Sequence, residues 1–138
     1  MTPAGEPSGL TIGSFSSVSL DPPLVGFLPG FSSKSWPEIA PSGSFCVNIL
    51  GADQADLCWR FAKETEGRFV GIEWTTGATG SPILAGAIGW IDCTIEQTYE
   101  MGDHWFVLGR VQELHAQDDV TDAMIFFKGK VNGVKPLQ

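Results

Sequence analysis

Short apolar runs recur along the chain, and Gly, Pro and Ser separate them at close intervals. This pattern predicts a sheet or barrel of short strands rather than a helical bundle. The clearest alternation lies in residues 91–96, where Ile91, Cys93 and Ile95 share one face and polar residues, beginning with Asp92, share the other. Strands are predicted over residues 10–18, 24–28, 44–50, 88–99, 105–114 and 124–131.

Two segments have the pattern of helices. Residues 55, 58, 61 and 62 are apolar at the spacing of one buried helical face, Asp53 is placed to cap this helix, and Lys63 suits its end. A shorter helix is predicted from residue 33 or 34 to about residue 39, with Pro37 near its start, where a missing N–H does no harm. We expect a turn at residues 21–23 and a surface loop at residues 75–82.

Length and charge restrict the class of protein. The 138 residues predict a single domain, residues 1–138, which is long enough for a genuine core. A formal net charge of -8 argues against nucleic acid and an anionic membrane as partners. The first residues lack a basic region followed by an apolar one, and no apolar run reaches the ~18 residues of a membrane span. The sequence therefore predicts a soluble protein of the cytoplasm.

The cysteines give no sign of a crosslink or a metal. Cys46, Cys58 and Cys93 form no CxxC pair and are odd in number. Neither a disulfide framework nor a zinc site is predicted from this arrangement. We expect three buried thiols in a reducing compartment.

Hydroxyl groups and backbone amides concentrate in two neighbouring segments, residues 11–19 and 31–36. In the first, which has no charged residue, serines lie beside Ile12 and Phe15, a mixture that suits a flat ligand with an apolar ring and polar edges. In the second, three serines surround Lys34, and such hydroxyls, loop amides and a cation can hold a phosphate. Two structural interpretations stay open, an edge strand whose hydroxyls face water and a short helix capped by serine.

The two histidines differ in their surroundings. His104 follows Gly102 and Asp103 at the start of a predicted strand, a position that suits either a turn residue or a catalytic group. His115 lies in a polar stretch and is expected at the surface. The large aromatic residues are expected in the core, with Trp90 and Trp105 inside the sheet.

Four sequence blocks follow one another in a characteristic order. They are TxxSFxSVSLDPPLV from Thr11, SSKSW from Ser32, FCVNIL from Phe45 and GDHxxxxGRV from Gly102. In these blocks the chain resembles the flavin reductase family, small NAD(P)H-dependent enzymes that supply reduced flavin to two-component monooxygenases. The resemblance runs from about residue 9 to residue 131. Members usually begin with a further strand and turn, so this chain is expected to enter almost directly at the second strand.

The resemblance implies a mainly β fold with short helices, the FMN-binding split β-barrel, working as a homodimer with flavin at or near the subunit interface. The implied cofactor is FMN or FAD, with NADH or NADPH as co-substrate. The implied binding residues are Thr11, Gly13, Ser14, Phe15, Ser16 and Ser17 toward the ring, and Ser32, Ser33, Lys34 and Ser35 toward the phosphate. Gly13 stands where the family commonly has Asn, so only its backbone can serve.

The resemblance also gives His104 a role. It is similar to the residue that lines the nicotinamide pocket beside the flavin, and Asp103 could orient its imidazole. No GxGxxG follows a predicted strand, so the nicotinamide nucleotide is expected to bind transiently over the flavin. Hydride transfer between two stacked rings needs no side-chain nucleophile. The predicted activity is that of an NAD(P)H:flavin oxidoreductase whose partner is a flavin-dependent monooxygenase.

Two other functions stay open at the level of the sequence. One is a flavin-binding carrier or sensor without reductase activity, which would retain flavin and leave NADH unoxidised. The other is a related split-barrel oxidase or a deazaflavin-dependent reductase, against which the GDH and GRV triplets of the last block argue.

Overall fold

The computed structural model describes residues 1–63, 66–120 and 122–134. Strands predominate among them, which confirms the predicted mainly β class with short helices. The elements, with η for 3-10 helices, are β1 (Ser16–Ser19), β2 (Leu24–Phe27), α1 (Trp36–Ile39), η1 (Ala40–Ser42), β3 (Ser44–Ile49), η2 (Ala52–Gln54), α2 (Ala55–Lys63), β4 (Trp74–Thr76), β5 (Pro82–Leu84), β6 (Gly89–Met101), β7 (His104–Ala116), β8 (Ile125–Phe127) and β9 (Lys130–Asn132).

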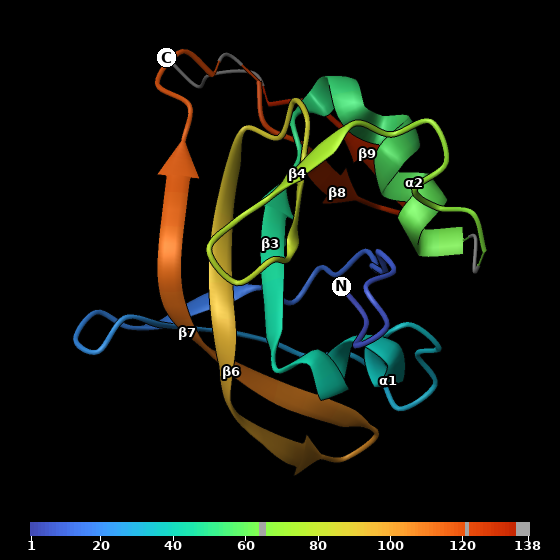
Figure 1. The fold of residues 1–138 in the computed structure, drawn as a ribbon. Helices are drawn as coiled ribbons and strands as arrows, with labels where there is room; N and C mark the ends of the chain where they lie inside the picture. Colours follow the sequence, from blue (N-terminus) through green and yellow to red (C-terminus); the bar gives the residue numbers. More distant parts are fainter. Residues whose placement is uncertain (64–65, 121, 135–138) are drawn as a thin grey trace.

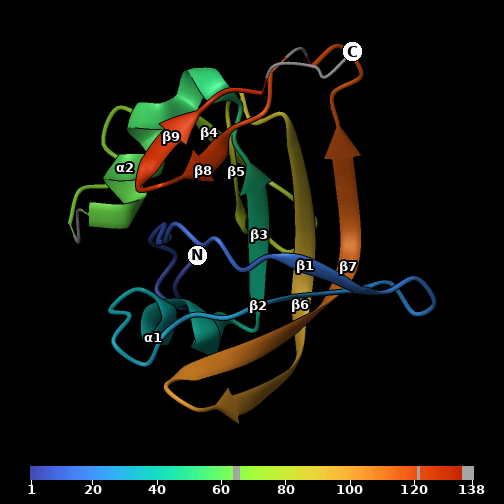
Figure 2. The same ribbon diagram turned by 180° about the vertical axis from the view of Figure 1, so that it is seen from behind.

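A five-stranded antiparallel sheet has the strand order β1-β2-β7-β6-β3. The long strands β6 and β7 bend along their length in Figure 1, and Figure 2 shows β1 and β2 lying across them. The β6–β7 register shifts between Asp92 and Cys93 and again between Ile95 and Gln97. Such irregularities bend a strand and increase its twist, which accounts for the curvature of the sheet.

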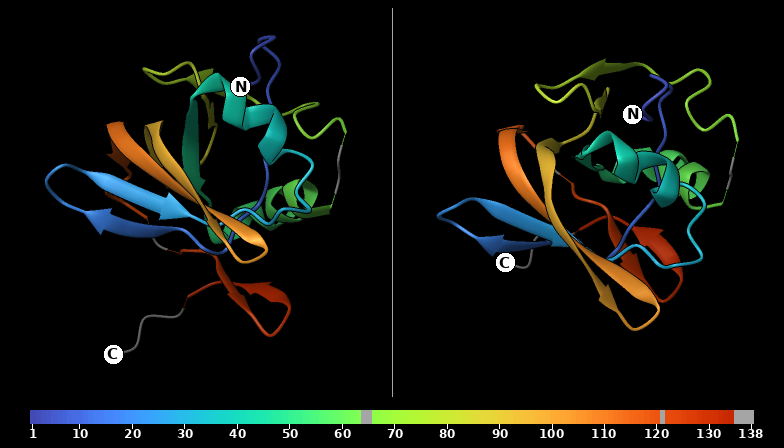
Figure 3. Two further views of the ribbon diagram at one scale, coloured as in Figure 1. Left: turned by 90° about the horizontal axis from the view of Figure 1, so that it is seen from below. Right: turned by 60° about the horizontal axis from the view of Figure 1, so that its bottom comes forward.

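One hydrophobic core joins the sheet to α1. Its buried residues are Val25, Phe27, Trp36, Ile39, Phe45, Cys93 and Val107. The ring of Phe27 makes edge contacts with the rings of Trp36 and Phe45, at centroid distances of 5.4 and 5.0 Å. A Cβ atom at Gly109 would overlap the ring of Phe45, so the glycine of the GRV triplet is required by this packing. In both views of Figure 3, α1 and the N-terminal segment lie on the same side of the curved sheet.

Strand β6 has the predicted apolar face, but its expected polar face is not fully exposed to solvent. Cys93 is fully buried, and Ile91 and Ile95 pack against the core. Asp92, expected on the polar face, is also fully buried, because the loop between β4 and β5 covers it. The N–H of Thr79 donates to Oδ2 of Asp92 at 2.8 Å, and its Oγ1 donates to Oδ1 at 2.6 Å. The expected surface loop at 75–82 is therefore shorter and partly internal.

The predicted strand over residues 10–18 is wrong in its first half, since β1 begins only at Ser16. Residues 10–15 take an irregular path instead of joining the sheet. The reason is that their apolar side chains turn inward at uneven spacing, with Leu10, Ile12 and Phe15 all packed against the core. A strict period of two, which a strand requires, is absent from these positions.

The predicted strand over residues 124–131 is a hairpin instead, formed by β8 and β9. Lys128 and Gly129 reverse the chain between them, with φ angles of 50° and 75°. The ring of Phe126 contacts Trp59 of α2 at a centroid distance of 6.1 Å. This contact places the hairpin beside α2, as Figure 2 shows.

Both predicted helices are present, although their starts differ: α1 begins at Trp36 rather than at residue 33 or 34. Gly51, and not Asp53, precedes the η2 turn, and its N–H donates to Oε1 of Gln54 at 3.2 Å. Phe61 is buried as predicted, whereas Ala62 is exposed. None of the helices within the described ranges has the length and apolar character to cross a membrane.

The remaining single-residue expectations have mixed outcomes. Trp90 and Trp105 are half-buried rather than fully internal. Of the cysteines, Cys93 is buried and the other two are half-buried. His115 is exposed, as expected.

Candidate functional site

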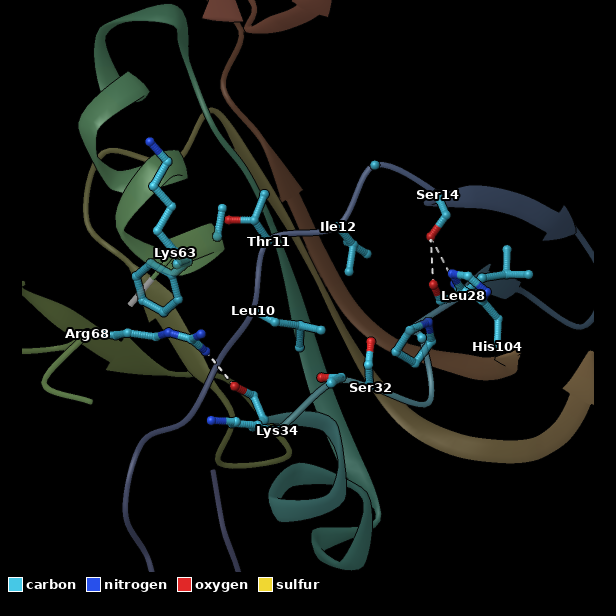
Figure 4. Close-up of a pocket in the computed structure, with 17 residues that line it drawn as sticks. Leu10, Thr11, Ile12, Ser14, Leu28, Ser32, Lys34, Lys63, Arg68 and His104 are labelled. Atoms are coloured by element: carbon cyan, nitrogen blue, oxygen red, sulfur yellow. Dashed lines mark hydrogen bonds between the residues drawn. The ribbon is translucent and has the colours of Figure 1, made fainter. Parts of the chain in front are cut away.

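A cavity of about 560 Å³ lies between the N-terminal segment, the loop from β2 to α1, and the end of α2. The residues that line it are Leu10, Thr11, Ile12, Gly13, Ser14, Leu28, Pro29, Gly30, Ser32, Ser33, Lys34, Ser35, Phe61, Ala62, Lys63, Arg68 and His104. Figure 4 shows His104 at one end and the cations Lys34, Lys63 and Arg68 toward the other. The volume lies within the range of sites for small organic ligands.

The first wall of the cavity, residues 10–14, is held in place by its hydroxyls. Thr11 Oγ1 donates to the carbonyl oxygen of Cys58 in α2 at 2.7 Å. Ser14 Oγ accepts the N–H of Leu28 at 2.9 Å. A Cβ atom at Gly13 would meet no described atom within 4 Å, so the backbone there is open to the cavity. Backbone groups and apolar side chains therefore make up most of this wall.

The second wall, residues 32–35, ends where α1 begins. Ser33 Oγ accepts the N–H of Trp36 at 3.1 Å, and Ser35 is the residue that precedes the helix. Ser35 is buried, whereas Ser32 and Lys34 are exposed. The expected arrangement of serines and a cation at a helix start is thus present, with Lys34 reaching solvent beside the cavity.

Two further cations belong to the site and were not among the predicted site residues. Arg68 donates to the carbonyl oxygen of Gly9 and to Oγ of Ser35. The ammonium group of Lys63 lies over the Trp59 ring, 4.7 Å from its centroid. Among the described lining residues there is no Asp or Glu, although the chain has a formal net charge of -8. This local excess of cations over carboxylates is not visible in the sequence, because it requires the fold.

His104 closes the opposite end of the cavity. Its Nδ1 donates to Oδ1 of Asp103 at 2.7 Å, and this hydrogen bond, together with the imidazole's charge when protonated, lowers the pKa of the Asp103 carboxyl. The orientation leaves Nε2 facing Gly30, where a Cβ atom would lie 3.6 Å from it and 3.6 Å from Oγ of Ser32. Glycine at position 30 therefore leaves room between the imidazole and the second wall.

Backbone hydrogen bonds fix the turn that carries His104. The N–H of Phe31 donates to the carbonyl oxygen of Asp103, and the N–H of Trp105 donates to that of Pro29, both at 2.9 Å. The rings of Phe31 and Trp105 also meet, with centroids 4.8 Å apart. The tip of the β6–β7 hairpin, which carries His104, is thus held against the loop after β2 by hydrogen bonds and a ring contact.

Three predicted site residues lie outside the cavity lining. Phe15 packs against the core, and Ser16 and Ser17 are exposed at the start of β1, where Ser16 Oγ donates to the carbonyl oxygen of Ser17. All the other predicted site residues line the cavity: Thr11, Gly13, Ser14, Ser32, Ser33, Lys34, Ser35 and His104. The structure thus brings together both predicted segments and the histidine, which are far apart in sequence.

Within the described residues, no cluster of His, Cys, Asp and Glu has the arrangement of a metal site. The thiols are poorly suited to bind metal for a second reason. Burial is the main cause that raises the pKa of Cys46 and of Cys93 to about 12, and the nearby Asp92 carboxylate raises both further. At neutral pH these groups are therefore protonated thiols rather than thiolate ligands.

Comparison with known proteins gives close relatives over nearly the whole chain. The sequence matches the flavin reductase like domain over residues 1–135. It is 46% identical over 133 residues to a flavin reductase from Pseudomonas putida, covering 96% of this chain and 78% of the relative. The reductase subunit HsaB of a flavin-dependent monooxygenase from Rhodococcus jostii is 42% identical over 132 residues, covering 96% of this chain and 67% of that protein.

Solved structures share the fold. A homologue of nitrilotriacetate monooxygenase component B from Mycobacterium thermoresistibile has a TM-score of 0.90 and 38% identity, covering 96% of this chain and 78% of that one. The NADH:FAD oxidoreductase SgcE6 of Streptomyces globisporus, in complex with NAD and FAD fragments, has a TM-score of 0.85 and 32% identity, covering 92% of this chain and 77% of that one.

Proposed function

The chain belongs to the flavin reductase like domain family, and we propose that it is an NAD(P)H-dependent flavin reductase that supplies reduced flavin to a partner monooxygenase. Its fold is the split β-barrel expected from the resemblance. Within the chain, one observation carries the proposal: a single cavity has His104 at one end and serines, loop amides and cations toward the other. A relative named as the reductase subunit of a flavin-dependent monooxygenase supports the assignment of the partner.

The lining of the cavity fits a phosphorylated flavin, either FMN or FAD. Leu10, Ile12 and Leu28 offer apolar contact to a flat ring, and the open backbone at Gly13 offers hydrogen bonds to its polar edge. The amides and hydroxyls of residues 32–35 suit a phosphate, with Lys34 as a point charge in the same segment. When bound, the flavin would accept a hydride from reduced nicotinamide, since that chemistry belongs to the cofactor.

The nicotinamide nucleotide, NADH or NADPH, is assigned to the His104 end. Asp103 fixes the imidazole through Nδ1, so that Nε2 can contact a ring placed over the flavin. The contribution of the protein is then proximity and orientation, which can supply a large part of a rate enhancement. The role of Phe15, Ser16 and Ser17 in flavin binding would be indirect. These residues connect the first wall, residues 10–14, to the sheet at β1.

The proposed quaternary state is a homodimer, and the proposed location is the cytoplasm. The support for the homodimer is a set of exposed apolar residues on the β8–β9 hairpin, where Ile125, Phe126 and Phe127 are 43%, 67% and 61% exposed. Clustered exposed apolar residues of this kind mark sites of protein association. Free cysteines suit a reducing compartment.

The decisive experiment is the oxidation of NADH and of NADPH by the purified protein, followed at the nicotinamide absorbance band with and without FMN or FAD. Oxidation that depends on added flavin is expected, because the open cavity suits reversible binding. A folded protein that retains flavin and oxidises neither nucleotide would contradict the reductase assignment and favour a flavin carrier.

A further inference from the structure

Hydrogen bonds join the segments that line the cavity toward each of its ends, and Figure 4 draws two of them as dashed lines. Ser14 in the first wall bonds to the backbone of Leu28, at 2.9 Å to the N–H and 3.5 Å to the carbonyl oxygen. At the other end Arg68 donates to the carbonyl oxygen of Gly9 and to Oγ of Ser35. Gly9 directly precedes the first wall, and Ser35 ends the second. Arg68 therefore connects the two walls from a third segment of the chain.

The position of Arg68 is itself fixed by packing. The next residue, Phe69, makes an edge contact with Phe61 of α2, with centroids 5.0 Å apart at 87°, and a second with Trp74 at 6.1 Å. Gly9 is equally confined, since a Cβ atom there would lie 2.8 Å from the ring of Phe61. Gly9, an acceptor of Arg68, and Phe69, the residue next to Arg68, are thus held in the same aromatic cluster.

The second acceptor, Ser35, lies in the part of the site that is proposed to bind phosphate. Ser35 is 6% exposed, and its carbonyl oxygen accepts the N–H groups of Glu38 and Ile39 at 3.1 Å, which begins α1. Lys34 is its direct neighbour. A displacement of Ser35 would therefore shift both the start of the helix and the cation beside it.

We propose that Arg68 is a positioning residue of the flavin site, which sets the separation of the two walls by binding Gly9 and Ser35. This inference rests on the proposed function. Nη1 of Arg68 makes both hydrogen bonds. Arginine suits the role because the planar guanidinium holds the two N–H groups of Nη1 in fixed directions, whereas lysine has a single ammonium group on a flexible stem. Because a flavin ring and its side chain contact both walls, Arg68 contributes to the binding of flavins with and without a phosphate.

The test compares the dissociation constants of FMN and riboflavin, measured by quenching of flavin fluorescence, in Arg68→Gln, Arg68→Lys and the wild type. Both variants are expected to weaken both flavins by about tenfold, the low end of the effect of a hydrogen bond to a charged group. Arg68→Lys keeps the charge and loses the planar guanidinium, so it is expected not to restore binding. Arg110→Gln on β7, which removes a cation outside the cavity lining, is the matched control and should leave both constants unchanged.

Other outcomes would overturn the proposal. A loss confined to FMN and restored by Arg68→Lys would make Arg68 a direct phosphate ligand, and unchanged binding of both flavins would leave it no role in the site. If Arg68→Gln does not fold, Arg68→Lys alone decides, since wild-type binding of both flavins by Arg68→Lys would contradict positioning by the planar guanidinium. A wild-type protein that binds neither flavin would refute the proposed function itself, a result separate from any effect of the variants.

Discussion

The serines of the second wall already bond to the chain, and the direction of those bonds decides what they can offer a ligand. Ser33 Oγ accepts the N–H of Trp36, and Ser35 Oγ accepts an N–H of Arg68. A hydroxyl that accepts one hydrogen bond still has its own proton to donate. Both serines can therefore donate to a phosphate oxygen while they hold the start of α1.

Lys34→Ala is expected to weaken FMN binding about five- to tenfold and to leave riboflavin nearly unaffected, because it removes a charge-assisted contact to phosphate at an exposed position. Titration of each flavin against wild type and variant measures this, with Arg110→Ala, outside the cavity lining, as the control for a general loss of charge. Equal losses for the two flavins would show that Lys34 does not contact the phosphate.

His104→Ala is expected to raise the KM for the nicotinamide nucleotide about tenfold and to change flavin affinity little, since in the proposed arrangement the imidazole contacts only the second substrate. Steady-state kinetics with each substrate varied separately checks this. His115→Ala removes the other histidine, which is exposed and away from the cavity lining, and should leave both constants unchanged. A collapse of flavin affinity in His104→Ala would assign His104 to the flavin site instead.

At the scale of elements, the loop between β4 and β5 is fastened to β6 by one carboxylate. Asp92 accepts both the N–H and the hydroxyl of Thr79, and Thr79 Oγ1 lies 2.8 Å from Oγ of the fully buried Ser81. A Cβ atom at Gly77 would come 2.6 Å from Oδ2 of Asp92, so the loop follows the carboxylate closely. The loop therefore covers the sheet because of polar contacts rather than apolar ones.

Asp92→Ala is expected to lower the free energy of unfolding by about 2 to 4 kcal/mol, because it removes a fully buried carboxylate and leaves the N–H and hydroxyl of Thr79 without their acceptor. Denaturation by urea measures this. Glu96→Ala, which removes an exposed carboxylate of the same strand and its ion pair with Arg110, is the control and should cost little. Equal losses for the two variants would contradict a special role of the buried network.

The elements differ in how far their sequence could reveal them. β3, β6 and β7 follow from alternating apolar residues, because alternate side chains of these strands face one core. The irregular course of residues 10–15 and the burial of Asp92 depend on partners distant in sequence, such as Leu28 and Thr79. The same holds for Arg68, which shares no local motif with Gly9 or Ser35. Local pattern therefore predicted the long strands and the polar segments, and missed β4, β5 and the side chains that connect distant segments.

At the scale of the whole molecule, the cavity is a positive region of an acidic protein. Three cations and no carboxylate occur among its described lining residues, while the chain as a whole has a formal net charge of -8. Clefts lined by one sign of charge concentrate ligands of the opposite sign. Both proposed ligands, a flavin phosphate and a nicotinamide dinucleotide, are anions.

The bonds that join residues 29–31 to residues 103–105 also bear on the order of folding. They close a loop of more than half the chain, and this loss of chain entropy precedes any gain from the contacts. The β6–β7 hairpin, by contrast, closes through a tight turn at Gly102. In stopped-flow refolding, quenching of flavin fluorescence is therefore expected to recover in the slowest phase, after the far-ultraviolet circular dichroism of the strands. Quenching that recovers in the fastest phase would show instead that the site assembles early, from local contacts.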